Sequence, residues 1–257
     1  GAHSFTVRIE DLAGNVGAIT SAARTLTLDT LAPSVTAAAA ITNITDNVGI
    51  ITGTIAAGAA TNDTTPTLSG TVSGTIASGD GVAVYDGAVR LGLATISGTT
   101  WSYTTAALGN GAHSFTVRVE DLAGNLGSVT SAARTLTIDA TAPTTTATIT
   151  GVTDDVGPVT GAVAANGSTN DATPTLAGTL TAALLAGEQV AIYDGAARLG
   201  LATVTGTGWT YTTAALANGA HSFTARVEDA VGNQGTASAA RGLTVDTVAP
   251  SASATST

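Results

Sequence analysis

Carboxylates recur at four fixed loop positions of a repeated sequence, and they are the side chains best suited to chemistry. Fourteen of the eighteen acidic residues occupy these positions. They are Asp46 with Asp154-Asp155, Asp63 with Asp171, the pairs Glu10-Asp11, Glu120-Asp121 and Glu228-Asp229, and the aspartates Asp29, Asp139 and Asp246. Oxygen ligands in flexible loops suit Ca²⁺ better than Mg²⁺ or a transition metal.

The repeat has a period of about 108 residues, the separation of Trp101 from Trp209 and of His113 from His221. This period is too long for a solenoid, and a unit of roughly 100 residues can bury its own core. Each copy ends in Asp-x-x-Ala-Pro, and proline stops a strand without starting a helix. We therefore predict a strand pair from a truncated repeat at 1–31, complete repeats at 32–140 and 141–247, and the start of another at 248–257.

Within the first complete repeat, short apolar and threonine-rich runs alternate with Gly, Asn, Asp and Pro clusters. Asp86-Gly87 is a strong hairpin signal. The predicted strands are 34–42, 67–71, 82–85, 90–96, 101–104, 113–120 and 135–138. About seven short strands without helical periodicity predict an all-β fold of tandem immunoglobulin-like sandwiches. Trp101, Trp209, Phe115 and Phe223 are expected to anchor the cores.

Sandwich topology gives these acids a common location. The loop between the first two strands and the end of the last strand meet at one pole, where the turn before the last strand of the next repeat also arrives. Crowded carboxylates without a cation would destabilise each other. We therefore predict three Ca²⁺ sites, made by Asp29, Glu120 and Asp121; by Asp46, Asp63, Asp139, Glu228 and Asp229; and by Asp154, Asp155, Asp171 and Asp246.

Composition narrows the function further. The net charge of −10 disfavours nucleic acid as a partner, and no apolar run is long enough to span a membrane. There is no cysteine for a disulfide or thiolate site, and no catalytic triad or phosphate loop is evident, so we expect no enzyme. His3, His113 and His221 are interpreted as structural groups at a strand end. A salt bridge from Arg24, Arg134 and Arg241 to Glu10, Glu120 and Glu228 is a further hypothesis.

The motifs of the second repeat resemble a known family. They are Thr153-Asp154-Asp155-Val156-Gly157, Asn170-Asp171-Ala172-Thr173-Pro174, Tyr193-Asp194-Gly195, Gly219-Ala220-His221-Ser222-Phe223, Asp229-x-x-Gly232-Asn233 and Asp246-x-x-Ala249-Pro250. Together they resemble the bacterial immunoglobulin-like repeats of giant surface adhesins and biofilm-associated proteins. The resemblance implies type I secretion, display on the bacterial cell surface and Ca²⁺-dependent stiffening of a rod.

We therefore expect extracellular extender repeats at the bacterial cell surface, whose partners are neighbouring repeats of the same chain, with other copies of it in a fibre or biofilm matrix as a further partner. Two alternatives stay open. The strand pair at 1–31 could complete its sandwich from a neighbouring chain and form a filament, or a loop or face of the sandwich could bind a ligand as an adhesive module.

Overall fold

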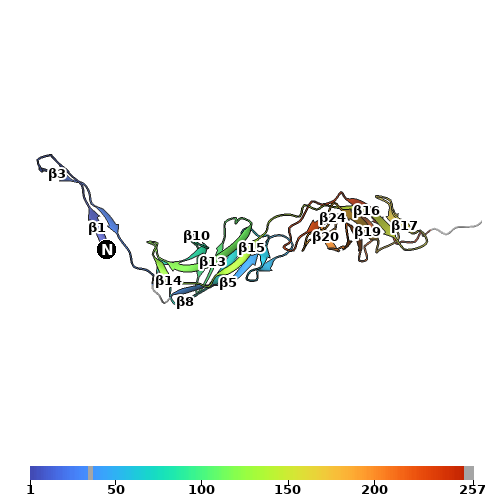
Figure 1. The fold of residues 1–257 in the computed structure, drawn as a ribbon, viewed down its shortest axis with the longest axis horizontal. Coiled ribbons are helices and arrows are strands. Elements are labelled where there is room, and N and C mark those ends of the chain that lie inside the picture. The colour runs from blue at the N-terminus through green and yellow to red at the C-terminus, as the bar shows by residue number, and fades with distance from the viewer. Residues whose placement is uncertain (34–36, 252–257) are drawn as a thin grey trace, which may run out of the picture. The chain divides into compact units, whose positions relative to one another are not determined.

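The computed structural model describes residues 1–33 and 37–251. The start of the strand predicted at 34–42, and most of the further repeat predicted at 248–257, lie outside these ranges. The described residues form strands, turns and loops and contain no α-helix, so none of them belongs to a helix that could cross a bilayer. The all-β fold predicted from the sequence is confirmed (Figure 1).

The strands of the two complete repeats follow the same order, except that β14 of the first repeat has no counterpart among the strands of the second. Those up to residue 61 are β1 (Ala2–Phe5), β2 (Arg8–Glu10), β3 (Val16–Thr20), β4 (Arg24–Thr27), β5 (Ala38–Asp46), β6 (Gly53–Thr54) and β7 (Ala60–Thr61). The first repeat continues with β8 (Thr67–Ser73), β9 (Gly81–Asp86), β10 (Val89–Leu93), β11 (Thr95–Ser97), β12 (Thr100–Thr104), β13 (Gly111–Glu120), β14 (Leu126–Thr130) and β15 (Arg134–Ile138). The second has β16 (Ala147–Asp154), β17 (Gly161–Ala162), β18 (Ser168–Thr169), β19 (Thr175–Leu180), β20 (Gln189–Asp194), β21 (Ala197–Leu201), β22 (Thr203–Thr205), β23 (Gly208–Thr212), β24 (Gly219–Glu228) and β25 (Arg241–Val245).

The chain forms two compact units. Unit 1 comprises residues 1–45, 54–59 and 65–137, and unit 2 comprises residues 46–53, 60–64 and 138–257. The loop segments 46–53 and 60–64 thus belong to the same compact unit as the second repeat.

Unit 1 is built on two facing sheets. One has the order β10-β9-β13-β15, with β14 also paired to β13, and the other has the order β11-β12-β8-β5. The sequence predicted one strand over 90–96, but in the structure this strand is interrupted at Ala94 and forms two strands, β10 and β11. β10 pairs with β9 in one sheet, and β11 pairs with β12 in the other. Strand β14 was not predicted, because its few apolar residues lie on a half-exposed edge.

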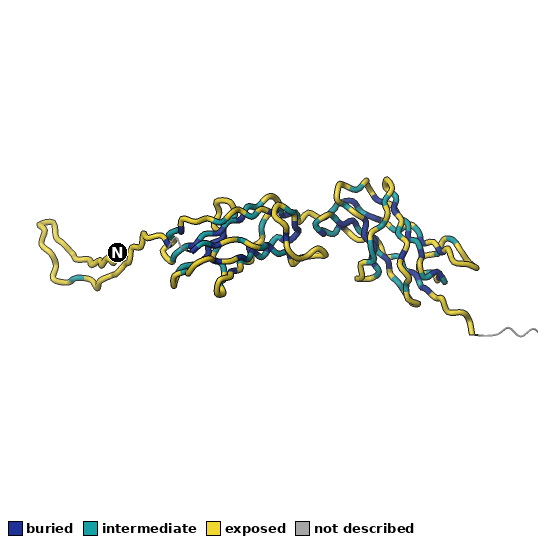
Figure 2. The backbone as a smooth tube through the Cα atoms, turned by 90° about the horizontal axis from the view of Figure 1, so that it is seen from below, coloured by how far each residue is buried: buried dark blue, intermediate teal, exposed yellow. Residues whose placement is uncertain are grey.

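Unit 2 repeats this architecture. One sheet has the order β17-β16-β19-β23-β22, and the other has the order β18-β25-β24-β20-β21. Its core combines strand residues from both sheets, with Phe223 and Trp209 buried among Leu176, Val190 and Ile192. In unit 1, Phe115 and Trp101 are buried in the same way. The four predicted aromatic anchors are therefore confirmed, and Figure 2 shows the buried residues running through the middle of each sandwich.

Close packing against these tryptophans explains two glycines. A Cβ built at Gly178 would lie 2.0 Å from the Thr148 carbonyl oxygen and 2.2 Å from Trp209 Cζ2. A Cβ built at Gly70 would likewise lie 1.8 Å from the Ala40 carbonyl oxygen and 2.7 Å from Trp101 Cζ2. A side chain has no room at either position, so glycine lets the indole lie flat on the neighbouring strand.

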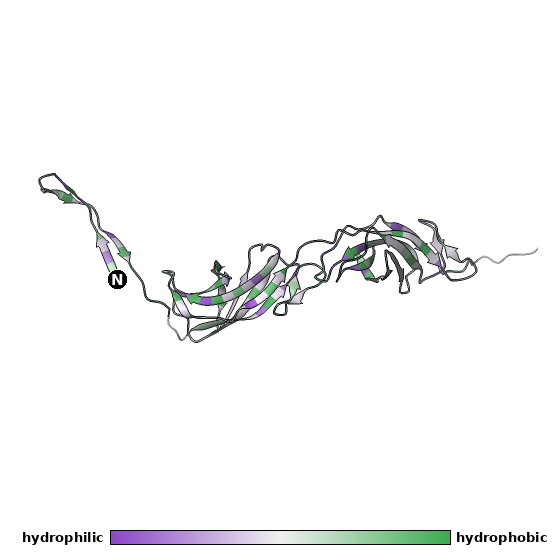
Figure 3. Cartoon of the chain, in the orientation of Figure 1, coloured by the Kyte–Doolittle hydropathy of each residue, from purple (hydrophilic) through white to green (hydrophobic). Residues whose placement is uncertain are grey.

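Residues 1–31 form one long hairpin with two short antiparallel pairs, β2 with β3 next to the turn and β1 with β4 beyond them. Their sequence differs from residues 111–141 at only seven positions. The apolar residues that are buried in β13 and β15 are nevertheless exposed here, as the yellow trace of Figure 2 and the green segments of Figure 3 show.

Candidate functional site

The turn that follows β24 in unit 2 is closed by a single aspartate. Asp229 Oδ1 accepts hydrogen bonds from the backbone N–H of Val231 at 3.0 Å and of Asn233 at 2.9 Å. Its Oδ2 accepts from Asn233 Nδ2 at 2.8 Å. Gly232 between them has φ +90°, a conformation that favours glycine. The Asp-x-x-Gly-Asn spacing is therefore the requirement of one tight turn.

The same asparagine also holds the segment that leads into the repeat, residues 139–143, which we call the lead-in. Asn233 Nδ2 donates to the Asp139 carbonyl oxygen at 2.7 Å. Asp139 Oδ1 in turn accepts from the N–H of Thr141 at 3.1 Å, and the Asp139 N–H donates to the Thr61 carbonyl at 2.9 Å. We call the contact between the turn asparagine and the lead-in carbonyl the clasp.

Unit 1 contains a second clasp of the same design. Asp121 accepts from the N–H of Ala123 and Asn125 and from Asn125 Nδ2, all at 2.8–2.9 Å. Asn125 Nδ2 also donates to the Asp29 carbonyl at 3.2 Å. The Asn125 side chain, followed by the backbone donors, lowers the pKa of Asp121 below its ordinary value. In both units the turn aspartate therefore orients an asparagine toward the lead-in.

The acids of the loop after the first strand are also tied to their own backbone. Asp154 accepts from the Val156 N–H at 2.8 Å and from Thr169 Oγ1 at 2.5 Å. Asp171 accepts from the Thr173 N–H at 2.7 Å and from the Asp155 N–H at 3.4 Å. Asp46 and Asp63 make equivalent contacts to Val48 N–H, Thr61 Oγ1 and Asn47 N–H. These buried carboxylates brace the loop internally.

Glu228 lies at the centre of a buried polar network in unit 2. Its side chain is 3% exposed and its Oε2 accepts from Arg198 Nη2 at 2.8 Å, while its Oε1 accepts from the Tyr193 hydroxyl. Gln234 Nε2 donates to the same hydroxyl at 2.8 Å. Burial, followed by the neighbouring Glu228 carboxylate, raises the pKa of Tyr193 to about 12. The Glu228 side chain is thus held by the Arg198 guanidinium on one oxygen and by the Tyr193 hydroxyl on the other.

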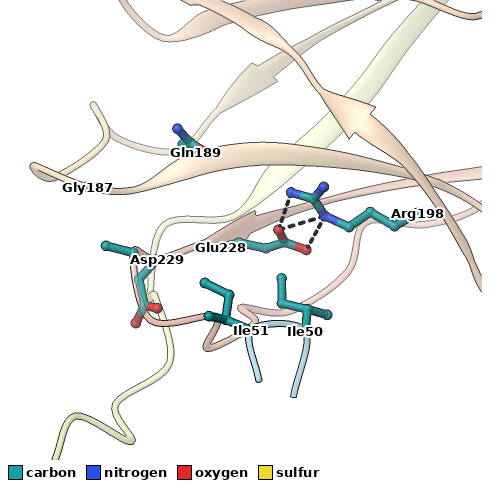
Figure 4. Close-up of a pocket in the computed structure, with 8 residues that line it drawn as sticks. Ile50, Ile51, Gly187, Gln189, Arg198, Glu228 and Asp229 are labelled. Carbon is teal, nitrogen blue, oxygen red and sulfur yellow. Dashed lines mark hydrogen bonds and ion pairs between the residues drawn. The ribbon is translucent and has the colours of Figure 1, made fainter. Parts of the chain in front are cut away.

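A hollow of about 430 Å³ opens beside this ion pair (Figure 4). Ile50 and Ile51 lie across it from Arg198 and Glu228, and the dashed contacts in the figure join the guanidinium to both carboxylate oxygens. The hollow combines the Arg198–Glu228 ion pair with two isoleucines, and Gln189 and Asp229 also line it.

In unit 1 the corresponding glutamate, Glu120, pairs with Arg90 at 2.7 Å. The hypothesis of a salt bridge from Arg134 to Glu120 and from Arg241 to Glu228 was wrong. Arg134 donates to the Ile55 carbonyl and Arg241 to the Val163 carbonyl. The arginines that reach the glutamates, Arg90 and Arg198, lie on β10 and β21 instead, which pair with β9 and β20 beside the strands that carry the glutamates.

Two repeat-equivalent hollows show how far the predicted metal ligands come together. In unit 2, Asp139, Glu188 and Asp229 line a hollow of about 280 Å³. In unit 1, Asp29, Asp80 and Asp121 line one of about 510 Å³. The oxygen-only donors suit Ca²⁺. However, nowhere in residues 1–33 and 37–251 do three His, Cys, Asp or Glu side chains lie close enough to hold an ion together.

The structure thus separates the predicted ligands into different roles. Glu120 and Glu228 pair with arginine, and Asp46, Asp63, Asp154 and Asp171 brace a loop, with Asp155 donating its N–H there. Asp246 accepts from the Val248 N–H at 3.0 Å and lines a hollow with Asp154. Sequence reasoning missed Asp80, Glu188 and the two clasp asparagines. The recurrence of asparagine at the end of each Asp-x-x-Gly-Asn turn was the available signal.

The family model described as bacterial Ig-like domain matches residues 38–140 and 145–247, which is most of the chain. The chain belongs to the bacterial Ig-like domain family. The resemblance inferred from the sequence motifs is confirmed at this level, and the two matched bacterial Ig-like domains contain the two sandwiches described above.

A curated relative, exoglucanase B of Cellulomonas fimi, is 36% identical over 154 residues, which are 57% of this chain and 12% of the enzyme. The chain thus spans about an eighth of that relative's length. Among solved structures, the fibronectin(III)-like modules of Clostridium thermocellum CbhA match 74% of this chain and 90% of theirs, at 18% identity and a TM-score of 0.41. The Escherichia coli adhesin FdeC matches 93% of this chain and 74% of its own, at 16% identity and a TM-score of 0.34.

Proposed function

We propose that this chain is a non-catalytic extender, a run of bacterial Ig-like domains that spaces other parts of an exported protein displayed at the bacterial surface. Its partners in this role are the neighbouring repeats of the same chain. The single observation that carries the proposal is the clasp, which occurs at the same repeat position in both units.

The clasp supports an extender because it acts on the connection into a repeat. The lead-in is a short, proline-containing segment whose residues 140–142 are exposed. The asparagine that donates this hydrogen bond is itself tied to the turn aspartate through its N–H and its Nδ2, so the bond fixes the lead-in backbone against the body of the repeat. Each such bond contributes about 0.5–1.5 kcal/mol, enough to bias the direction in which the chain enters.

Two polar side chains of the types used in catalysis are engaged in structural contacts. Glu228 is neutralised by Arg198, and His221 is held between Asp194 Oδ2 at 2.6 Å and the Ala217 carbonyl at 2.9 Å. An acid–base catalyst needs a group that can exchange its proton with a substrate. These groups favour a structural module over an enzyme.

Calcium stays part of the proposal for the acidic hollows, which are lined by Asp139, Glu188 and Asp229 in unit 2 and by Asp29, Asp80 and Asp121 in unit 1. Because no three of these carboxylates lie close enough to share an ion, backbone carbonyls and water would have to complete its ligands. A bound ion would screen the mutual repulsion of these carboxylates. The clasp does not depend on the ion, since its contacts are made by protein atoms alone.

Small-angle scattering of the whole chain tests the extender role, with calorimetric Ca²⁺ titration as a second measurement. We expect an elongated particle whose flexibility increases when Asn125 and Asn233 are both replaced by alanine. A compact particle, or one indifferent to these changes, would contradict the proposal. If the chain did not bind Ca²⁺ at millimolar concentration, the calcium part of the proposal would be wrong, and the role of the clasp would be unaffected.

A further inference from the structure

Basic side chains are few in this chain, and all of them lie in strands. The sequence has eight arginines and no lysine. A soluble protein of this length ordinarily carries about thirty basic residues, since about a quarter of its residues are charged. The loops and turns of residues 1–33 and 37–251 contain none. The eight are Arg8, Arg24, Arg90, Arg118, Arg134, Arg198, Arg226 and Arg241.

Strand pairing holds the backbone around the six arginines of the two complete repeats. Arg118 and Arg226 lie in β13 and β24, which have paired strands on both sides. Arg90 and Arg198 lie in β10 and β21, which are edge strands paired on one side. An extended peptide in a binding cleft forms main-chain hydrogen bonds with its binder. A protease therefore reaches the bonds after these arginines only when the strand has left its sheet.

The guanidinium groups of the same six arginines are also engaged. Arg90 and Arg198 pair with Glu120 and Glu228. A protease of trypsin specificity holds its substrate through an aspartate in a side-chain pocket, so the guanidinium must first leave its partner. The other four contacts are from Arg118 to the Gly127 carbonyl at 2.9 Å, Arg134 to the Ile55 carbonyl at 3.0 Å, Arg226 to Gln234 Oε1 at 2.7 Å and Arg241 to the Val163 carbonyl at 2.7 Å.

We propose that the two complete repeats resist proteases that cut after lysine or arginine for as long as the repeats stay folded. Cleavage at the six sites then follows the small population of open chains. The resistance is specific to this class of protease, because the loops 74–80 and 181–188 expose alanines such as Ala77 and Ala183 to enzymes that cut after small residues. The inference is independent of the extender role.

Residues 1–31 provide an internal comparison. Arg8 and Arg24 also lie in strands, but in this segment every residue except the half-buried Thr20 is exposed, and the pairs are two-stranded. A two-stranded hairpin is marginally stable in water. Cuts after Arg8 and Arg24 should therefore come first, and they show that the protease is active in the same sample.

Limited digestion of the whole chain with trypsin, followed by mass spectrometry of the fragments, tests the proposal. We expect cleavage after the six arginines of the complete repeats to be at least about a hundredfold slower than after Arg8 and Arg24. An elastase that cuts after alanine should cleave within 74–80 and 181–188 under the same conditions, because exposed loops are the preferred sites of nicking.

Two variants separate the position of an arginine from its presence. Ala183→Arg places one in the exposed loop between β19 and β20 and should be cut after position 183 at least about tenfold faster than any site of unit 2 in the unchanged chain. Thr210→Arg places one on the exposed face of β23, which is paired with Ala177 and Thr203 on its two sides, and should add no cut. Their denaturation midpoints are measured to match stability.

The equivalent variants in unit 1, Thr75→Arg and Ser102→Arg, repeat the comparison if a unit 2 variant does not fold. Rapid cleavage of the unchanged chain after any of the six arginines would overturn the proposal. Equal cleavage of the loop and strand variants of matched stability would overturn it as well, and so would a loop arginine that stays uncut, since strand placement would then not be the cause of resistance.

Discussion

The His113 imidazole is held between two acceptors, with Nδ1 2.6 Å from Asp86 Oδ2 and Nε2 2.9 Å from the Gly109 carbonyl oxygen. A neutral imidazole carries one ring proton and can satisfy only one of them, whereas the imidazolium satisfies both. His221 has the same arrangement with Asp194 and Ala217. The contact therefore ties the start of β13 or β24 to the β-turn after β9 or β20 by a charged group.

This geometry predicts a loss of stability on the alkaline side of histidine titration. Burial alone would lower the pKa of His113, but the Asp86 carboxylate and the Gly109 carbonyl outweigh it, and the pKa is raised above 6.5. The contribution is therefore complete below about pH 6.5, the unfolded value, and disappears as the pH rises through the folded pKa. Denaturant unfolding from pH 5 to pH 9 measures it.

The matched variants for this prediction are Asp86→Asn and His113→Gln. Asparagine keeps an oxygen for the Ser114 N–H, which donates to Asp86 Oδ1 at 2.8 Å, but removes the charge that favours imidazolium. Either variant should flatten the pH dependence of the free energy of unfolding of unit 1. The pH dependence for unit 2 should be unchanged, because unit 2 retains His221 and Asp194. An unchanged pH profile would show that the imidazolium is not the source.

The two arginine–glutamate pairs should differ in energy because they differ in burial. Glu228 is 3% exposed at its side chain, against 12% for Glu120. Removing the partner of a buried charge costs about 3–5 kcal/mol, whereas a solvent-exposed pair contributes about 0–1 kcal/mol. Arg198→Met should therefore destabilise unit 2 by about 2–4 kcal/mol, and Arg90→Met should cost unit 1 about 1 kcal/mol or less.

Chemical denaturation followed by the tryptophan of each unit, Trp101 or Trp209, separates these effects. A double variant of Arg198→Met with Glu228→Gln serves as the control, since it removes the unpaired charge and should recover part of the loss. Equal losses for Arg198→Met and Arg90→Met would contradict the burial argument.

The close packing of Gly178 against Trp209 predicts how much one added methyl group would destabilise unit 2. Gly178→Ala would place Cβ against the Thr148 carbonyl oxygen and the indole, so the strand or the ring must move. We expect a loss of about 3 kcal/mol or more in the free energy of unfolding. Gly151→Ala on the neighbouring strand β16 meets nothing within 4 Å and should change it by less than about 0.5 kcal/mol. Thermal unfolding that ranked the two alike would refute this account.

Asn233→Ala should release the lead-in of unit 2 without unfolding the sandwich. The amide exchange of residues 139–143 should become faster, because the Asp139 carbonyl loses its donor and the turn loses one contact to Asp229. Asn125→Ala is the internal control, since it should affect residues 29–33 and leave 139–143 unchanged. The prediction would be contradicted if the amides of residues 139–143 exchanged equally fast in the Asn233→Ala and Asn125→Ala variants.

The sequence by itself determined the fold class and the repeat. Alternation along Phe115, Val117 and Val119 places three residues on one face of a strand wherever that strand lies, and Gly87 after Asp86 closes a hairpin through local backbone preference. Both features act over a few residues, so they can be read without knowing what packs against them. The same holds for the Asp-x-x-Gly-Asn turns, which Asp121 and Asp229 close from within five residues.

Only the tertiary structure decided which partner each charged side chain takes. Glu228 meets Arg198 rather than Arg241 because strand pairing brings residues 30 positions apart to one sheet edge, and no local pattern encodes that choice. Asn233 reaches Asp139 across 94 positions for the same reason. Carboxylates that the sequence placed at one pole were thereby divided among arginine, hydroxyl and backbone donors, since each takes the nearest donor that the folded chain supplies.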